Sequence, residues 1–226
     1  MSINIQSLFN EVNELKNDYV RNKSEFISKH KNGPLKPKHI YFEVGENNQT
    51  FTNLCMNVDS IKEHLQWKFD PIEVDIRCHT MESSVNDILR VHPVITVTFG
   101  NIGMFRLAPH GSNQIELTTI VVEPYIKSKG MGSLMMICVL GMINEHMSDD
   151  FDTIMLECVG SLGQGDLSLK SSIKEQTKFF RKFGFRVVKD SKNPDGTPSY
   201  VQMNYFSDKL DETYLSQLMY KTSDNK

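Results

Sequence analysis

This sequence of 226 residues lacks several features that would by themselves indicate a class of protein. The sequence has only four cysteines, and no two of them form a CxxC pair: Cys55, Cys78, Cys138 and Cys158. A disulfide scaffold or a cysteine-based zinc site is therefore not expected, and a reducing compartment fits this pattern best. The seven histidines show no HxxxH or His/Cys spacing, so we expect no metal.

A strong net charge and a membrane-spanning run are missing as well. The formal net charge is -3 and the pI is about 6.2, which gives no general positive field for nucleic acid. The most apolar run, Met131–Ile143, is too short to cross a bilayer and contains Gly141. No signal-peptide pattern precedes it. We therefore expect a cytoplasmic protein with no nucleic-acid or membrane partner and a buried helix at 131–143.

The composition of the chain is that of a single folded domain of ordinary size. Hydrophobic residues make up 39% of the chain, enough for one core with a terminal addition. Apolar residues at helical spacing predict a helix over 5–27, followed by a loop with Gly33, Pro34 and Pro37. We thus expect an N-terminal helix and linker at 1–38 and a main domain at 39–226. The helix is also a candidate homodimer interface.

Local patterns predict the elements of the main domain. In its first part we expect strands at His39–Val44, Thr50–Val58 and Ile72–Arg77, and helices at Asp59–Lys68 and Met81–Arg90. From Pro93 onward we expect strands at Val94–Phe99, Gly103–Leu107, Ile115–Val122, Thr153–Val159, Phe185–Lys189 and Tyr200–Phe206. Helices are expected from the glycine loop to about Met147, at Glu175–Phe183 and at Asp208–Tyr220, with a loop at Gly160–Ser172.

The strand at Ile115–Val122 leads into a loop with two glycines at the start of the following helix. Gly130 and Gly132 allow the backbone to approach a ligand closely. The free N–H groups of the helix N-terminus attract a phosphate or pyrophosphate, and Lys127 and Lys129 add positive charge. The residues themselves therefore predict a phosphate-bearing ligand at a strand-to-helix turn.

The loop resembles a motif of the GNAT acetyltransferases. The stretch Lys127-Ser128-Lys129-Gly130-Met131-Gly132 is similar to their Q/R-x-x-G-x-G/A loop, with lysine at the first position. A second stretch, Phe179-Phe180-Arg181-Lys182-Phe183-Gly184-Phe185, resembles their L-Y-x-x-x-G-F ending. The resemblance covers Pro93–Phe206. It implies an α/β fold whose mixed, mostly antiparallel central sheet is flanked by helices and splayed at its centre.

The resemblance also implies a function, a cofactor and site residues. We expect an N-acetyltransferase that moves the acetyl group of acetyl-CoA to a primary amine, on a small molecule or a protein, by direct attack in a ternary complex. The cofactor-binding residues that it implies are Ile120, Val121, Val122, Lys127, Ser128, Lys129, Gly130, Met131, Gly132 and Ser133. Glu116 is the implied catalytic base, because an ammonium must lose a proton before it attacks a thioester. His110 is expected in a turn before this strand, exposed to solvent or in contact with substrate.

One departure from the family pattern keeps a second function open. Phe180 stands where many members carry the tyrosine that protonates the leaving thiolate. Tyr125, Tyr200 and Tyr205 are the candidate replacements. Alternatively, the chain is a coenzyme-binding or interaction module that retains the fold without turnover. Cys158 is a candidate for acetylation, but a buried core thiol is the stronger expectation.

Overall fold

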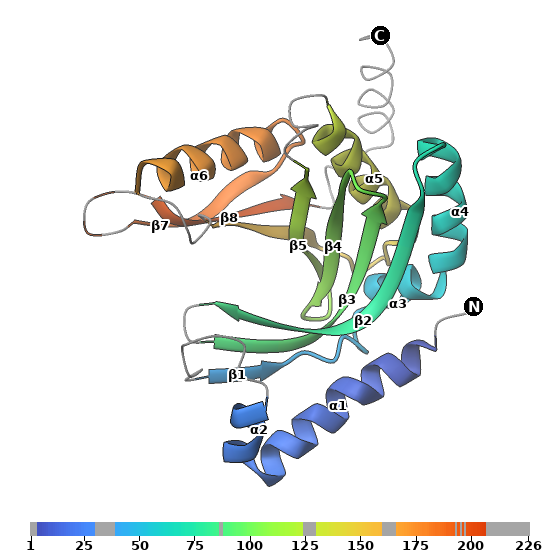
Figure 1. Ribbon diagram of the computed structural model, residues 1–226, viewed down its shortest axis with the longest axis vertical. Helices are drawn as coiled ribbons and strands as arrows, with labels where there is room; N and C mark the ends of the chain where they lie inside the picture. Colours follow the sequence, from blue (N-terminus) through green and yellow to red (C-terminus); the bar gives the residue numbers. More distant parts are fainter. Residues whose placement is uncertain are drawn as a thin grey trace.

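A computed structural model of the chain (Figure 1) describes residues 4–29, 39–85, 88–123, 130–159, 166–192, 194, 196 and 198–206. Within this range the helices are α1 Ile5–Arg21, α2 Lys23–Lys29, α3 Gln49–Met56, α4 Val58–Phe69, α5 Met131–His146 and α6 Asp166–Arg181. The strands are β1 His39–Phe42, β2 Val74–Val85, β3 Ile88–Phe99, β4 Gly103–His110, β5 Gln114–Val122, β6 Thr153–Val159, β7 Arg186–Lys192 and β8 Pro198–Phe206.

These strands form a single mixed sheet. Their order is β1-β3-β4-β5-β6-β8-β7, and β2 pairs with β3. Within the described strands, β1 with β3 and β5 with β6 are parallel, and every other pair is antiparallel. In Figure 1, α3, α4 and α5 lie along one side of β2 to β5, and α6 lies across β7 and β8. The predicted fold class, a mostly antiparallel sheet flanked by helices, is confirmed.

The sheet opens between β5 and β6, as the resemblance implied. These two strands pair only over Gln114–Leu117 and Thr153–Leu156, although both continue to Val122 and Val159 in the described structure. A β-bulge on β5 lies where the pairing ends. Arg106 pairs with Thr119 but Leu107 pairs with Leu117, which leaves Thr118 as the extra residue. A bulge bends its strand and increases the local twist, so it directs the end of β5 away from β6.

The core is built around α5, which has buried residues on most of its surface. Because it is apolar on all sides, it lies in the interior and contacts both β5 and α3. Its buried residues are Met135, Met136, Ile137, Cys138, Val139, Leu140, Met142 and Ile143. The expected buried helix at 131–143 is therefore confirmed.

The predicted helix over 5–27 is two helices. Asn22 is not helical, with φ -146° and ψ 80°, and its side chain accepts a hydrogen bond from the backbone N–H of Glu25. It therefore ends α1 and caps α2. The turn places the Phe26 ring 5.5 Å from Tyr19 and 5.7 Å from Phe42. Tertiary packing of these rings, which local spacing does not express, accounts for the break.

Two predicted elements of the first half were wrong. Thr50–Val58, expected as a strand, belongs mostly to helix α3, because Asn48 accepts a hydrogen bond from Phe51 N–H at 2.9 Å and caps it. Met81–Arg90, expected as a helix, is divided between β2 and β3, which pair along their whole length. Helix propensity at Met81 and Glu82 is weaker than the long-range pairing of this ladder.

The second half agrees more closely with prediction. The strand Thr153–Val159 is found with the predicted bounds, and the strand and helix on each side of the glycine loop are confirmed. The loop expected at Gly160–Ser172 was wrong in its second part, because α6 begins at Asp166. The helix expected at Asp208–Tyr220 lies outside the described residues.

Candidate active site

The end of β5 presents backbone groups to the gap in the sheet. Residues 119–122 pair with β4 on one side, but nothing in the described part of β6 pairs with them on the other. A strand paired on one side directs every second N–H and C=O to its open side. The predicted cofactor residues Ile120, Val121 and Val122 lie in this stretch, and Val121 is 41% exposed. An extended ligand can therefore bind there as an additional strand.

The N-terminus of α5 lies at the same end of β5. Gly130 caps the helix in the left-handed region, with φ 83°, and among the described residues outside its own helix turn no heavy atom lies within 4 Å of where its Cβ would be. A Cβ on Gly132 would lie 3.5 Å from Val122 Cγ2 and 3.5 Å from Phe179 Cζ. The start of α5 therefore contacts both β5 and α6, and it has no side-chain cap.

This arrangement brings together the predicted cofactor residues that are described. Met131, Gly132 and Ser133 form the first turn of α5, directly beyond Val122 in space. Their N–H groups are the ones that a helix leaves unbonded and that bind anions. Lys127, Ser128 and Lys129 lie outside the described residues, so their part in the site stays a prediction.

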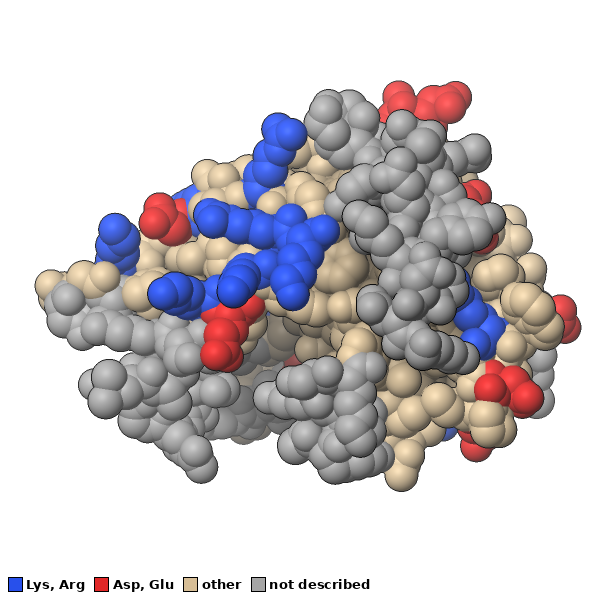
Figure 2. Space-filling view, turned by 90° about the horizontal axis from the view of Figure 1, so that it is seen from above, with Lys and Arg blue, Asp and Glu red and all other residues tan. Residues whose placement is uncertain are grey.

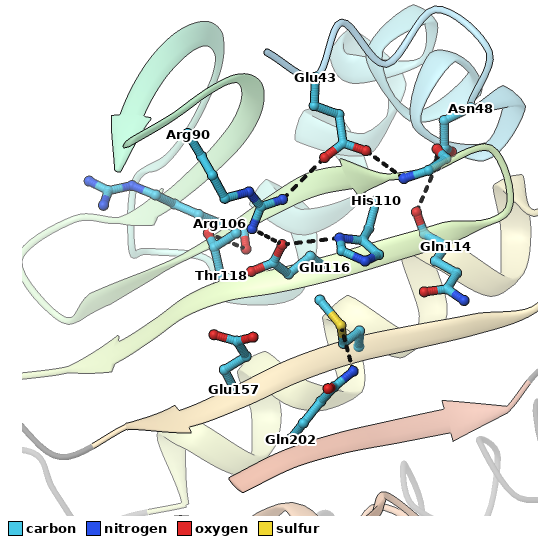
Figure 3. Close-up of polar contacts among 12 residues, drawn as sticks. Glu43, Asn48, Arg90, Arg106, His110, Gln114, Glu116, Thr118, Glu157 and Gln202 are labelled. Carbon is cyan, nitrogen blue, oxygen red and sulfur yellow. Dashed lines mark hydrogen bonds and ion pairs between the residues drawn. The ribbon is translucent and has the colours of Figure 1, made fainter. Parts of the chain in front are cut away.

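Glu116 lies deep in the sheet and is held by charged neighbours (Figure 3). Its side chain is only 7% exposed, and its Oε2 accepts a hydrogen bond from Arg90 Nη1 at 2.7 Å. Oε2 is also 3.7 Å from His110 Nδ1. Arg90 Nη2 contacts Glu43 Oε2 at 3.1 Å, and Glu43 accepts a hydrogen bond from the Gly111 N–H. The result is a row of alternating charges that runs from Glu43, directly after β1, across β3, β5 and β4.

These contacts set the pKa values of the two central groups. Burial alone would raise the pKa of Glu116, but the neighbouring His110 and the charge and hydrogen bond of Arg90 outweigh it and lower that pKa. The Glu116 carboxylate, 3.7 Å from Nδ1, raises the pKa of His110, against the effect of burial. Glu116 is therefore an ionised, enclosed carboxylate, while the His110 side chain is 40% exposed. Of the two, only the imidazole is open to a substrate.

His110 is not in the turn that the sequence predicted. It is the last residue of β4 and pairs with Gln114 at the start of β5. Since it is a diagonal neighbour of Glu116 on adjacent strands, the two side chains share one face of the sheet. Neither Arg90 nor Glu43 was identified from the sequence. An isolated charge in a strand carries no motif, and Arg90 had been assigned to a helix.

Tyr200 of β8, one of the candidate replacements for the missing phenol, lies on the same face of the sheet as Glu116. Phe180 itself is buried against Phe179 and Phe185 and supplies no phenol. Among the candidate replacements, Tyr205 is 1% exposed in the core and Tyr125 lies outside the described residues.

Tyr200 is half-buried, and its hydroxyl lies 2.9 Å from Glu157 Oε1 and 3.1 Å from Gln202 Oε1. Burial first, and then the Glu157 carboxylate, raises its pKa, which keeps this phenol protonated. Glu157 lies two residues beyond Met155, the β6 partner of Glu116, and so points to the same face.

The structure also bears on Cys158, on metal-ligating groups and on membrane-spanning helices. Cys158 is fully buried with its Sγ 3.9 Å from Met203 Sδ, and burial raises its pKa to about 11, as expected of a core thiol. No group of three metal-ligating side chains occurs among the described residues. No described helix combines the length and the apolar character needed to cross a membrane.

The groove of about 670 Å³ between α4 and α5 is not part of this site. It is lined by the other half of α5, including Gly141 and Met142, and by His64 and Trp67 of α4. None of the candidate residues lines it.

Comparison with known proteins finds similarity only among solved structures. No family model and no curated protein matches the chain. A GNAT family acetyltransferase from Elizabethkingia anophelis, solved with acetyl-CoA bound, is 14% identical, with 59% of this chain and 97% of that chain covered and a TM-score of 0.39.

Two further structures are similar to the same degree. The ribosomal-protein-S18-alanine N-acetyltransferase from Escherichia coli is 13% identical, with 50% of this chain and 67% of that chain covered and a TM-score of 0.36. Ard1 from Thermoplasma volcanium is 18% identical, with 51% and 69% covered and a TM-score of 0.35. These three matches cover between 50% and 59% of this chain.

Proposed function

We propose that this chain is an N-acetyltransferase that transfers the acetyl group of acetyl-CoA to a primary amine. The observation that carries the proposal is the separation of β5 from β6 next to the start of α5. This separation leaves the edge of β5 open toward β6, and the N-terminus of α5 lies at the end of that edge. A thioester on a long amide-bearing arm, ending in a pyrophosphate, needs these two features in this order.

In this proposal the coenzyme lies along the gap. Ile120, Val121 and Val122 pair with the amides of the pantetheine arm, and backbone N–H groups of β5 polarise the thioester carbonyl. Residues Lys127–Ser133 hold the pyrophosphate, with N–H groups from the first turn of α5. Among the described residues outside its own helix turn, no atom lies within 4 Å of the Cβ position of Gly130, which leaves room there for the phosphate oxygens.

The acceptor amine attacks the carbonyl carbon of the thioester in the ternary complex. Its nitrogen forms the new bond to carbon, the carbon–sulfur bond breaks, and the coenzyme leaves as the thiolate. Glu116 remains the predicted base, and we propose that it acts through His110. The exposed imidazole takes the amine proton and the enclosed carboxylate stabilises the imidazolium. Tyr200 is the candidate donor of the proton that the thiolate needs.

One observation favours the second candidate function, a coenzyme-binding or interaction module without turnover. With Phe180 buried in the core, the helix that carries the usual phenol supplies none. A coenzyme-binding module without turnover would retain β5 and α5 and would release no free thiol with any amine. The two functions therefore share a binding step and differ in the chemical step.

Calorimetric titration of the full chain with acetyl-CoA tests the binding step. A Gly130→Asp variant places a carboxylate where the phosphate would lie, so we expect binding by the unchanged chain and none by the variant. Gly196→Asp is the matched control, because Gly196 also has positive φ, 79°, and open space at its Cβ. Binding that survives Gly130→Asp, or no binding by the folded unchanged chain, would overturn the proposed coenzyme site.

The chemical step is then tested with a panel of primary amines and a free-thiol assay. The panel should include peptide lysines, peptide N-termini, polyamines and aminoglycosides. Thiol release with any of them supports the transferase, and binding without release from any supports the module.

A further inference from the structure

Two of the four cysteine thiols lie against each other where α3 meets β2. Cys78 Sγ is 3.7 Å from Cys55 Sγ, although the two residues are 23 positions apart in the chain. Two sulfurs at this distance are in contact, and a disulfide bond holds them at about 2.0 Å. Cys138 and Cys158 lie elsewhere, on α5 and β6, and Cys158 contacts the thioether of Met203 instead. Cys55 and Cys78 are therefore the pair that can react with each other.

Each of these two thiols is held in place by the element that carries it. Cys78 lies inside β2, where its backbone pairs with Ile95 of β3. Cys55 lies in α3, which is anchored by the buried side chains of Phe51 and Leu54. The fold thus fixes the two positions independently of their mutual contact, and this gives a high effective concentration of one thiol at the other. A bond between them requires the sulfurs to close by about 1.7 Å, a movement of side-chain size.

The two thiols differ in their access to solvent. Cys55 is 2% exposed, and contact with Cys78 and burial raise its pKa, so it is not the thiol that a reagent meets first. Cys78 is half-buried, and the described part of β2 pairs with β3 alone, which leaves the other edge of β2 without a strand. A thiol within reach of solvent beside a buried second thiol is the arrangement of a redox-active pair.

Helix α3 connects this pair to the candidate site. Its N-cap residue, Asn48, is fully buried, and the amide donates hydrogen bonds to Gly111 O at 3.1 Å and to Gln114 O at 2.6 Å. Gly111 lies in the turn that follows His110, and Gln114 begins β5. A covalent bond from Cys55 to β2 would therefore restrain the helix that also holds this turn.

We propose that Cys55 and Cys78 are an oxidation site, at which a small-molecule disulfide converts the two thiols into an intrachain disulfide bond. The thiolate of Cys78 attacks one sulfur of the small disulfide, forms a mixed disulfide and releases one small thiol. Cys55 then gives up its proton and attacks Cys78 Sγ, which releases the second small thiol. Two protein thiols are oxidised, one small disulfide is reduced, and the two small thiols take up the two protons. This oxidation is independent of the proposed acetyl transfer.

The test exposes the folded full chain to oxidised glutathione at neutral pH. The remaining thiols are then alkylated, and the digested protein is analysed by mass spectrometry without reduction. We expect half of the four free thiols to be lost and a linked peptide that joins Cys55 to Cys78. This peptide should be lighter than its two reduced parts together by two hydrogen atoms, and dithiothreitol should cleave it. Cys138 and Cys158 are buried and should remain alkylatable once the protein is unfolded.

A neutral reagent excludes an effect of charge on this reaction. Oxidised glutathione is an anion, and exposed Lys and Arg side chains, among them Lys178 and Arg181 of α6, gather on the surface in Figure 2. Figure 1 places α6 away from α3 and β2. Bis(2-hydroxyethyl) disulfide carries no charge, and it should therefore give the same linked peptide.

Alanine variants separate the roles of the two thiols. Cys55→Ala lacks the second thiol, so the mixed disulfide on Cys78 should persist. Cys78→Ala should leave Cys55 unmodified, because the buried thiol does not meet the reagent. Cys158→Ala removes a core thiol outside the pair, so it is the matched control and should still form the bond.

Three results with the folded unchanged chain would overturn the proposed oxidation site. They are four unmodified cysteines, a mixed disulfide that persists on Cys78, and a bond from either thiol to Cys138 or Cys158. None of these results bears on the coenzyme site, so the proposed function stands or falls separately.

Discussion

At the scale of single residues, the proposed chemistry depends on how Glu116 is enclosed. The carboxylate is a plausible base by position, yet Arg90 at 2.7 Å and a 7% exposed side chain make it a poor one for a bulky substrate. A base must reach the proton that it removes. His110 combines contact with Glu116 and exposure to solvent. In the proposed mechanism, His110 and Glu116 together perform the proton transfer that a free glutamate would perform alone.

The pKa of His110 tests this division without knowledge of the acceptor. Glu116 is the first cause of its raised pKa, with Glu43 adding to it and Arg90 opposing it. In Glu116→Gln the pKa of His110, measured by NMR titration, should fall, because the largest cause of its increase is removed. His64→Gln serves as an assignment control on an exposed helix face. An unchanged His110 titration in Glu116→Gln would show that the two groups are not coupled.

The same shift has a consequence for stability, with a definite sign. A raised pKa in the folded state stabilises the fold fully below the ordinary histidine value of about 6.5. That contribution is lost as pH rises through the folded-state pKa of His110. Urea unfolding of the unchanged chain should show this loss, and Glu116→Gln should show less of it.

At the scale of elements, the site depends on how β5 ends and α5 begins. Gly130 and Gly132 are both predicted loop glycines, but the structure gives them different roles. Gly130 has φ 83° and needs the freedom of glycine, whereas Gly132 is helical and has room for a methyl group. Gly130 is therefore required for its backbone conformation, and Gly132 marks the place where β5, α5 and α6 approach one another closely.

Two alanine variants should separate these roles. Gly130→Ala forces an alanine into the left-handed region and should cost about 1 kcal/mol in the free energy of unfolding. Gly132→Ala should cost nothing and gain up to about 1 kcal/mol, because it restricts the unfolded chain. Denaturant unfolding of both variants measures the difference. Equal losses in the two would mean that the strain argument for Gly130 is wrong.

At the scale of the whole molecule, the N-terminal helix is continuous with the main core. Phe9 of α1 is 4% exposed and packs into the cluster that includes α3, α5 and the sheet. Val12 packs with Phe26, Leu89 and Val91 in a second cluster beneath β1 and β3. If the N-terminal segment served only as a linker or a dimer interface, these side chains would not be buried against the rest of the same chain.

Truncation of Phe9 tests that continuity. Phe9→Ala should lower the free energy of unfolding by about 3 to 4 kcal/mol within a single transition. Val20→Ala, at a residue 74% exposed on the same helix, should change it by less than about 0.5 kcal/mol. Two separate unfolding transitions in the unchanged chain would instead make residues 1–38 an independent unit.

The sequence by itself determined the elements whose signal is local. The apolar run of β5, the paired glycines and the all-apolar α5 follow one another within 33 residues, from Gln114 to His146, and each is stabilised by its own composition. That was enough to predict a phosphate-binding turn, whereas the fold class and most of the proposed site were implied by the resemblance of these residues to the GNAT loop. It was also enough to place Glu116 in the strand beside it.

Only the tertiary structure decided the contacts between distant segments. Residues 81–90 pair as strands because β2 and β3 form a ladder along their whole length, an energy that no ten-residue window contains. The sheet order β3-β4-β5 brings Arg90 of β3 to Glu116 of β5, 26 residues away, and the pairing of β4 with β5 places His110 beside them. Long-range pairing and burial outweigh local propensity of a few tenths of a kcal/mol per residue. For this reason the sequence predicted where the coenzyme would bind but not which side chain would be open to the acceptor.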